Sequence, residues 1–259
     1  GLGAVNTYQT MNKWIEDKTK GMIDKLFEEP LSPEARLVLL NTLYFKGKWA
    51  NPFENQDTRE EIFTLENGTT ESVNMMNKGR EYLSYVKDDK AEGIVLPYLD
   101  GDMVFMALKP VGGQSVREMY DNLTIESINA MLEQKETTLC NLKLPKFEVE
   151  FHKELNDSLK RMGLEVAFTD GLADFSGIGV TDNGNNIYIE KVQQKSKIIV
   201  DEEGTEAAAV TSVEMFECTS AYNPEMPVEV YFDVPFLYMI MDKERKVPLF
   251  IGIMDNPNN

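Results

Sequence analysis

The sequence predicts an α+β fold with largely antiparallel sheets, in a single domain over residues 1–259. Three observations lead to this fold class. The 259 residues are 42% hydrophobic and 10% aromatic, which is enough for a large packed core. Segments with helical spacing and segments rich in strand residues are mixed without regular βαβ alternation. A turn at Asp100-Gly101 lies between two apolar runs and is a specific hairpin signal.

Helices are expected in three places. In the first, Met11, Ile15, Met22 and Leu26 recur at three- and four-residue spacing, which predicts a helix that continues to Glu29-Pro30. An amphipathic helix of this kind needs a surface to cover. The other two helical patterns lie within residues 115–134 and 153–162, and the last ends at Gly163 as a left-handed cap.

Strands are predicted through the rest of the chain. Residues 36–45 are a nearly continuous apolar run, which predicts a central strand covered on both faces. Residues 53–110 contain short strands separated by turn signals at 67–68, 78–79, 88–89 and 100–101. The remaining predicted strands are 138–151, 187–200, 228–232, 236–241 and 249–253.

The charge of the chain excludes several classes of partner. It has 26 Lys and Arg against 44 Asp and Glu, a net charge of −18. Such a chain repels phosphate backbones and anionic lipids, and the sequence contains no basic patch, so we expect no nucleic-acid and no membrane partner. Cys140 and Cys218 allow one disulfide at most, and no apolar run approaches about 18 residues.

Signals of enzymatic chemistry are few. His152 is the single histidine, so a metal centre or a histidine-based triad would have to be built around it alone. We interpret it as a structural histidine. Phosphate-binding glycine motifs are missing, and none of the many possible carboxylate pairs has a distinctive context. We therefore predict no enzyme, no metal and no cofactor.

The segment from Asp201 to Asp233 is the most informative one. It opens with acidic and small residues and continues without any fixed period, which is typical of a long functional loop. By composition alone a helix start is the favoured alternative, because Glu202, Glu203 and Glu206 suit a first turn and three alanines follow.

Residues 202–209 (EEGTEAAA) resemble the hinge of the reactive-centre loop of inhibitory serpins, the serine protease inhibitor family. The resemblance extends over nearly the whole chain in family order. The other matching segments are 40–49 (LNTLYFKGKW), 144–147 (LPKF), 173–178 (ADFSGI), 232–237 (FDVPFL) and 248–252 (PLFIG).

The resemblance implies a serpin-like fold of mixed and antiparallel sheets surrounded by helices. It also implies a suicide inhibitor: a target protease attacks the loop within about residues 202–227 and forms a covalent acyl complex, and the cleaved loop inserts into the main sheet. Small residues in the hinge favour insertion, so we prefer an inhibitor to a non-inhibitory binding, carrier or chaperone serpin. The implied hinge residues are Glu202, Glu203, Gly204, Thr205, Glu206, Ala207, Ala208 and Ala209.

The resemblance implies two positions for the scissile bond. Counting forward from the hinge places it at Cys218-Thr219, whereas counting back from the following strand places it near Pro224. Since residues 198–242 contain no Lys or Arg, an elastase-like, chymotrypsin-like or cysteine protease is expected rather than a trypsin-like one. The alternative scissile positions are Phe216, Glu217 and Tyr222.

Three further residues match the family's shutter and breach regions. These are Asn41, Trp49 and Gln194, the last standing where the family commonly has a histidine. The chain resembles a serpin domain without its amino-terminal third, so we expect impaired inhibition by this chain alone, and self-association through an exposed sheet edge. We also expect an extracellular protein, with an intracellular location left open.

Overall fold

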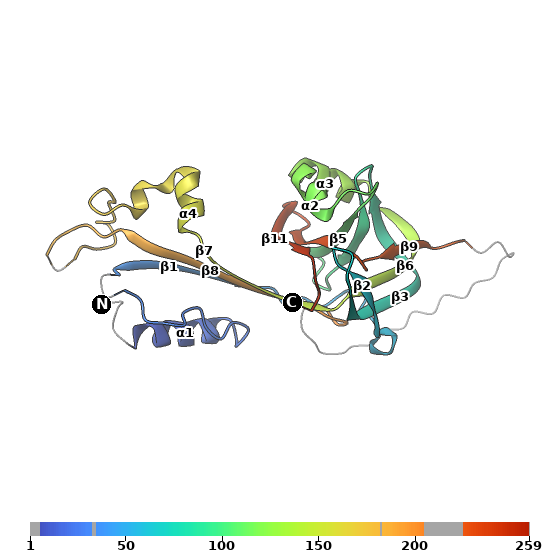
Figure 1. Cartoon of the computed structure of the whole chain (residues 1–259), viewed down its shortest axis with the longest axis horizontal. Helices are drawn as coiled ribbons and strands as arrows, with labels where there is room; N and C mark the ends of the chain where they lie inside the picture. Colours follow the sequence, from blue (N-terminus) through green and yellow to red (C-terminus); the bar gives the residue numbers. More distant parts are fainter. Residues whose placement is uncertain (1–5, 33–34, 182, 205–224, 259) are drawn as a thin grey trace. The chain divides into compact units, whose positions relative to one another are not determined.

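The computed structural model confirms the α+β class, with helices packed on two sheets (Figure 1). The chain divides into two compact units, residues 1–45 with 149–198 and residues 46–148 with 199–259. The single domain over residues 1–259 stays a prediction, although the chain divides into these two units. The residues that the structure describes are 6–32, 35–181, 183–204 and 225–258.

The first unit is built on a three-stranded sheet. Its order is β1 (Leu37–Tyr44), β8 (Ile189–Val200) and β7 (Phe147–Glu154), with β1 parallel to β8. The prediction of a central strand at β1 is wrong for the described chain, because β1 is an edge strand there. Leu39 and Leu43 are 43% and 39% exposed on one face of it, since strand alternation turns them away from the helix that covers the other face.

The helix on this sheet is α1 (Thr7–Lys18), which is shorter than predicted. Its last turn is closed by Thr19, whose hydroxyl donates to the Ile15 carbonyl (2.8 Å) and accepts from the Ile23 amide (3.0 Å). Lys20 and Gly21 then adopt positive φ of 53° and 81°, which a continuing helix does not allow. Residues 19–32 therefore form an irregular connector between α1 and β1.

The opposite face of the sheet is partly covered by the segment that follows β7. The predicted helix over 153–162 is only one turn, α4 (Asn156–Leu159), followed by the π-type turn η2 (Lys160–Leu164) and the short η3 (Val166–Phe168). Gly163 is left-handed as predicted, with φ 98°. The spacing of Leu155, Leu159 and Met162 predicts that the three share one helix face, but Met162 is 79% exposed because the helix has already ended.

The second unit contains the larger sheet. Its order is β11 (Val247–Met254), β10 (Phe236–Asp242), β5 (Met103–Pro110), β4 (Ala91–Pro97), β3 (Thr70–Lys87), β6 (Glu136–Pro145) and β9 (Val228–Tyr231), and β2 (Arg59–Thr64) also pairs with β3.

Most neighbours in this sheet are antiparallel, as the sequence predicts, but β9 runs parallel to β6. Asp100-Gly101 does form the turn between β4 and β5, with Gly101 at φ 78°. The turn predicted at Lys78-Gly79 is wrong. The strand continues there through a bulge, with Arg80 at φ 53° and a shift of register against β6.

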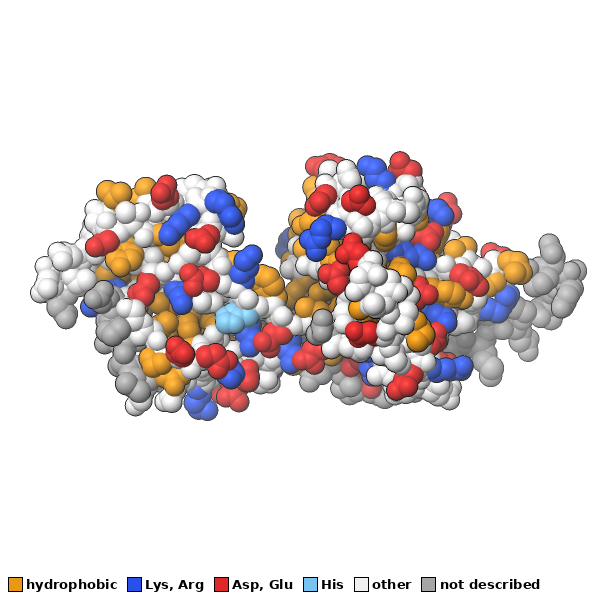
Figure 2. Space-filling model, viewed as in Figure 1, with side chains coloured by type: hydrophobic (Ala, Val, Ile, Leu, Met, Phe, Trp, Pro, Cys, Tyr) orange, Lys and Arg blue, Asp and Glu red, His pale blue; other side chains and the backbone are white. Residues whose placement is uncertain are grey.

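Two short helices cover one part of the larger sheet. They are α2 (Val116–Asn122) and α3 (Ile125–Glu133), each started by a capping box, at Ser115 and Thr124 respectively. Their buried side chains pack with residues of β4, β5 and β10 in one core. On the face drawn in Figure 2, acidic and basic side chains are interspersed rather than gathered into a single patch.

Candidate functional site

The candidate site begins where β8 ends. The chain turns at Asp201–Gly204: the Asp201 amide donates to the Gly204 carbonyl (3.0 Å), and the Asp201 carboxylate accepts from the amides of Glu203 (3.0 Å) and Gly204 (3.2 Å). Gly204 has φ 135°, and a Cβ there would overlap the backbone of residues 47–49. Only glycine fits this position without strain.

The turn is held against the segment around Trp49. The Trp49 amide donates to the Glu203 carbonyl (2.9 Å), its indole Nε1 donates to the Asp201 carbonyl (2.9 Å), and the Phe53 amide donates to the Glu202 carbonyl (2.7 Å). Trp49 is 3% exposed and stacks on Tyr98 at 4.7 Å between ring centroids. Backbone and side-chain bonds of Trp49 together fix the turn with which the predicted hinge starts.

Glu202 is the charged member of this site. Its carboxylate, 8% exposed, accepts a hydrogen bond from the Thr58 hydroxyl (2.7 Å) and pairs with the Lys146 ammonium (2.7 Å). Burial acts to raise the pKa of Glu202, but the bonds from Lys146 and Thr58 outweigh it and leave the pKa below its ordinary value. The carboxylate is therefore held in its charged form.

A second anchor lies on the other side of the undescribed segment 205–224. The Tyr82 hydroxyl donates to the Glu225 carboxylate (2.9 Å), and the Arg80 guanidinium donates to the Glu225 carbonyl (3.4 Å). Arg80 lies at the bulge of β3, where φ is 53° and the register against β6 shifts. Three residues later the chain enters β9.

The structure also locates the predicted shutter pair. Asn41 of β1 and Gln194 of β8 are direct partners in the parallel register. The side-chain oxygen Oε1 of the neighbouring Gln193 accepts a hydrogen bond from His152 Nε2 (2.9 Å), a contact between β8 and β7 that the sequence did not reveal. The predicted shutter residues thus face each other across the boundary between β1 and β8, in the first unit.

The predicted site residues fall into three groups. Glu202, Glu203 and Gly204 are brought together with Trp49. Asn41 and Gln194 belong to the other unit. The predicted positions outside the described residues are Thr205, Glu206, Ala207, Ala208, Ala209, Phe216, Glu217, Cys218, Thr219 and Tyr222.

Sequence reasoning missed Thr58, Tyr98 and the role of Lys146. Lys146 does lie in the quoted LPKF segment, so a motif signal existed for it. Thr58 and Glu202 are 144 positions apart, and no local pattern connects them.

Comparison with known proteins decides the family. The family model described as "Serpin (serine protease inhibitor)" matches residues 3–257. The chain belongs to the serpin family. Human Serpin B13 is 34% identical to it over 95% of this chain, and an uncharacterized serpin-like protein of Thermococcus kodakarensis is 36% identical over 96%.

Solved serpins share the fold of this chain. The native state of tengpin, a thermophilic serpin, has a TM-score of 0.85 at 35% identity, and human thyroxine-binding globulin has a TM-score of 0.85 at 26% identity. Each match covers 99% of this chain, but only 64% and 66% of the respective solved chains. The chain likewise spans 62% of Serpin B13 and 56% of the Thermococcus protein.

The family assignment bears on the chemistry and the class of partner of the chain, whereas the hinge residues and the cellular location stay predictions. Serpins as a family are protease inhibitors rather than enzymes, and a protease is the class of partner that the family name gives. Among the described residues, no group of three or more His, Cys, Asp and Glu side chains could hold a metal ion, and no helix could span a membrane. One relative, at 33% identity, is named Intracellular coagulation inhibitor 2 of Tachypleus tridentatus, so secretion stays a prediction.

Proposed function

We propose that the protein is a suicide-substrate protease inhibitor whose reactive loop is residues 202–227. The observation that carries this proposal is the pairing of β8. It lies directly beside a parallel strand, β1, and its chain turns back at Asp201–Gly204 immediately after the strand ends. A following segment that folds back between them would run antiparallel to both, which is a favourable sheet arrangement.

The reaction would proceed in two stages. The nucleophile of the target protease attacks the carbonyl carbon of the scissile bond, the amine of the next residue leaves with a proton, and an acyl-enzyme ester or thioester remains. Loop insertion then separates the leaving amine from the acyl group and distorts the protease. If about a dozen residues join the sheet at ~0.5–1.5 kcal/mol per hydrogen bond, insertion gains on the order of 10 kcal/mol.

The target class follows from what the loop lacks. No Lys or Arg lies between Lys197 and Lys243, so a protease with an acidic specificity pocket has no matching side chain there. We propose Cys218-Thr219 as the scissile bond and an elastase-like, chymotrypsin-like or cysteine protease as the target. Phe216, Glu217 and Tyr222 stay as alternative positions.

The natural full-length protein provides the test. Incubation with an elastase-like or chymotrypsin-like protease should give a complex that survives SDS, and mass spectrometry of the adduct should identify the bond cleaved. Trypsin should give no such complex. Ala207→Pro should convert the inhibitor into a substrate that is cleaved and released, because proline cannot donate to the new ladder, whereas Ala207→Ser should still form the complex. Cleavage without a complex for the unaltered protein would overturn the proposal.

A second function has one observation in its favour. Thyroxine-binding globulin, whose name describes binding of a hormone, is similar in structure at a TM-score of 0.85. A binding or carrier serpin would be cleaved in the loop without forming the covalent complex. The same mass spectrometry therefore distinguishes the two functions.

Self-association remains part of the proposal. β1 is one of the two edge strands of the described three-stranded sheet, and edge strands recruit partners through their backbone groups. We propose that a second copy adds to this edge when the 259-residue chain is studied alone, and that such a chain inhibits poorly. A covalent protease complex formed efficiently by the 259-residue chain would contradict the second statement.

A further inference from the structure

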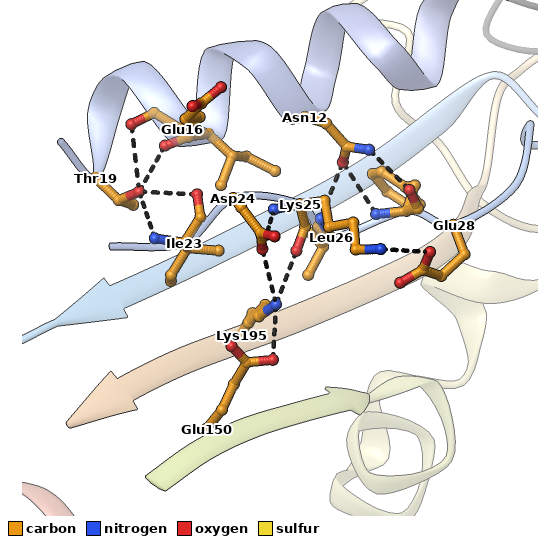
Figure 3. Close-up of polar contacts among 12 residues, drawn as sticks. Asn12, Glu16, Thr19, Ile23, Asp24, Lys25, Leu26, Glu28, Glu150 and Lys195 are labelled. Carbon is orange, nitrogen blue, oxygen red and sulfur yellow. Dashed lines mark hydrogen bonds and ion pairs between the residues drawn. The ribbon is translucent and has the colours of Figure 1, made fainter. Parts of the chain in front are cut away.

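Two lysines are buried in the described chain, Lys195 and Lys78, at 5% and 7% exposure. A lysine is almost never this buried unless its charge is satisfied. The ammonium of Lys195, on β8, contacts oxygens of Glu150, Lys25 and Asp24 (Figure 3). Lys78 lies on β3 in the other unit and is satisfied in a different way.

The ammonium of Lys78 binds residues 52 and 53. It donates to the Pro52 carbonyl (2.7 Å) and lies 4.9 Å from the centroid of the Phe53 ring. It also pairs with the Glu81 carboxylate at 3.3 Å, but that side chain is 44% exposed, so water weakens the pair. A carbonyl oxygen and the face of an aromatic ring both attract a cation. Lys78 therefore attaches residues 52 and 53 to β3.

The neighbouring Asn77 binds the other end of the same segment. Its side-chain Nδ2 donates to the Asp57 carbonyl (3.0 Å). Two consecutive residues of β3 thus hold the segment 52–58 near both of its ends.

The segment 52–58 in turn holds the turn at Asp201–Gly204. The Phe53 amide donates to the Glu202 carbonyl, and the Thr58 hydroxyl donates to the Glu202 carboxylate, each at 2.7 Å. The turn with which the proposed reactive loop starts is therefore joined to β3 through this segment.

The bulge of β3 follows directly after Lys78. Lys78 and Glu81 are three positions apart on β3, whereas their partners on β6 are only two positions apart. The bulge thus adds one residue, which turns Lys78 and Glu81 to the same face of the sheet. The amide of Arg80, inside the bulge, donates to the side-chain oxygen of Asn141 on β6 (2.9 Å), and this bond fixes the bulge.

Beyond the bulge, β3 holds the other end of the proposed loop. Tyr82 and Arg80 both donate to Glu225, through the bonds described above. Six consecutive residues of one strand, 77–82, therefore bind Glu225 directly and the turn at Asp201–Gly204 through the segment 52–58.

We infer that Lys78 is a positioning residue that couples these two ends of the proposed reactive loop. A displacement of Arg80 and Tyr82 moves the bulge and with it Lys78, and Lys78 then shifts the segment 52–58. An apolar side chain could fill the same space, but only a cation is attracted to the Pro52 carbonyl and the ring beside it. The role in inhibition rests on the proposed function: a protease that docks on the loop pulls on Glu225, and the coupling carries this pull to the turn where insertion starts.

The coupling can be tested by amide hydrogen exchange on the natural full-length protein. Tyr82→Phe removes the hydroxyl bond to Glu225, and it should raise the exchange rates of the Trp49 and Phe53 amides, which donate to the turn, about two-fold or more. In a Lys78→Met background, Tyr82→Phe should leave these two rates unchanged, although Lys78→Met itself raises them. The same factor in both backgrounds would show a lysine with a merely structural role and overturn the inference, as would no effect of Tyr82→Phe in the unaltered protein.

Lys109→Met is the matched control. The Lys109 side chain is 18% exposed and pairs with Glu92 at 3.3 Å, and within the described chain no side-chain bond joins it to the segment 52–58 or to the bulge. In this background Tyr82→Phe should keep its full effect, and loss of the effect here would contradict a specific role of Lys78. Lys78→Arg retains the charge and should retain the coupling. If Lys78→Met does not fold, Lys78→Gln removes the charge in its place, with the same expected direction.

A second measurement connects the coupling to the proposed function. With a protease that the natural full-length protein inhibits, Lys78→Met should change the ratio of covalent complex to released cleaved protein several-fold, and Lys109→Met should not. If no protease forms a complex, the proposed function fails, yet the exchange experiment still decides whether the two ends are coupled. An unchanged ratio together with lost coupling would overturn the part of the inference that concerns inhibition.

Discussion

The ammonium of Lys146 lies 2.7 Å from the carboxylate of Glu202, and this pair joins the junction of β6 and β7 to the turn at Asp201–Gly204, where the proposed reactive loop starts. The two partners differ in exposure, at 38% for the lysine side chain and 8% for the glutamate. The lysine therefore keeps some water, while the glutamate depends on Lys146 and Thr58 for its solvation. This difference in exposure decides which of the two residues destabilises the protein more when it loses its ion-pair partner.

Removal of Lys146 should cost more than removal of the Glu202 charge. Lys146→Met leaves a buried carboxylate with Thr58 as its remaining side-chain partner, whereas Glu202→Gln leaves a lysine that water can reach. We expect losses of about 1–3 kcal/mol in the free energy of unfolding, with the larger loss for Lys146→Met. Denaturant unfolding followed by Trp49 fluorescence, in a Trp14→Phe background, measures both.

A double-mutant cycle then isolates the pair. The double variant should lose less than the sum of the two single losses, because the two residues contact each other. The exposed pair of Lys246 and Glu133 serves as control, and Glu133→Gln should change stability by less than about 0.5 kcal/mol. Additive losses at Lys146 and Glu202 would mean that the pair contributes no energy of its own.

Acid should weaken the hinge through Glu202. Its pKa is lowered in the folded protein from an ordinary value of 4.5, so near that pH the unfolded state binds more protons than the folded state. The stabilisation is thus fully present above pH 4.5 and is lost as the pH falls through the lower folded pKa. We expect the stability difference between the unaltered protein and Glu202→Gln to narrow over that range. A constant difference from pH 7 down to pH 3 would argue against this assignment.

Local signals in the sequence predicted the parts of the fold that depend on local chemistry. Asp100-Gly101 forms its hairpin because the turn geometry and the two apolar strands are adjacent in the chain. The end of α1 could not be predicted in this way, since Met22 and Leu26 keep helical spacing. What ends the helix is the Thr19 hydroxyl together with Asn12, and Asn12 holds the connector only after the chain has folded back.

The same distinction applies to the site. Motifs in short segments of the sequence predict the hinge at Glu202 and Gly204 and the breach residue Trp49. The bond from the Trp49 indole to Asp201 and the bond from the Thr58 hydroxyl to Glu202 depend on long-range packing. The spacing of residues in the sequence does not predict such contacts. The limit of prediction from the sequence is clearest at Gln193. It lies next to the predicted Gln194, yet strand alternation and β7 give it the bond to His152.

Gly204→Ala should release the hinge from Trp49. The alanine would have to adopt φ 135°, at about 1–3 kcal/mol, and its Cβ would overlap the backbone at Gly47, which cannot rotate away as a flexible side chain would. Trp49 should then lose its bond to Asp201 and become more exposed, so its emission in the Trp14→Phe background should shift to longer wavelength. Gly79→Ala is the matched control, because a Cβ there meets nothing within 4 Å and φ is not positive. Identical emission from the two variants would show that the turn at Gly204 does not hold the hinge.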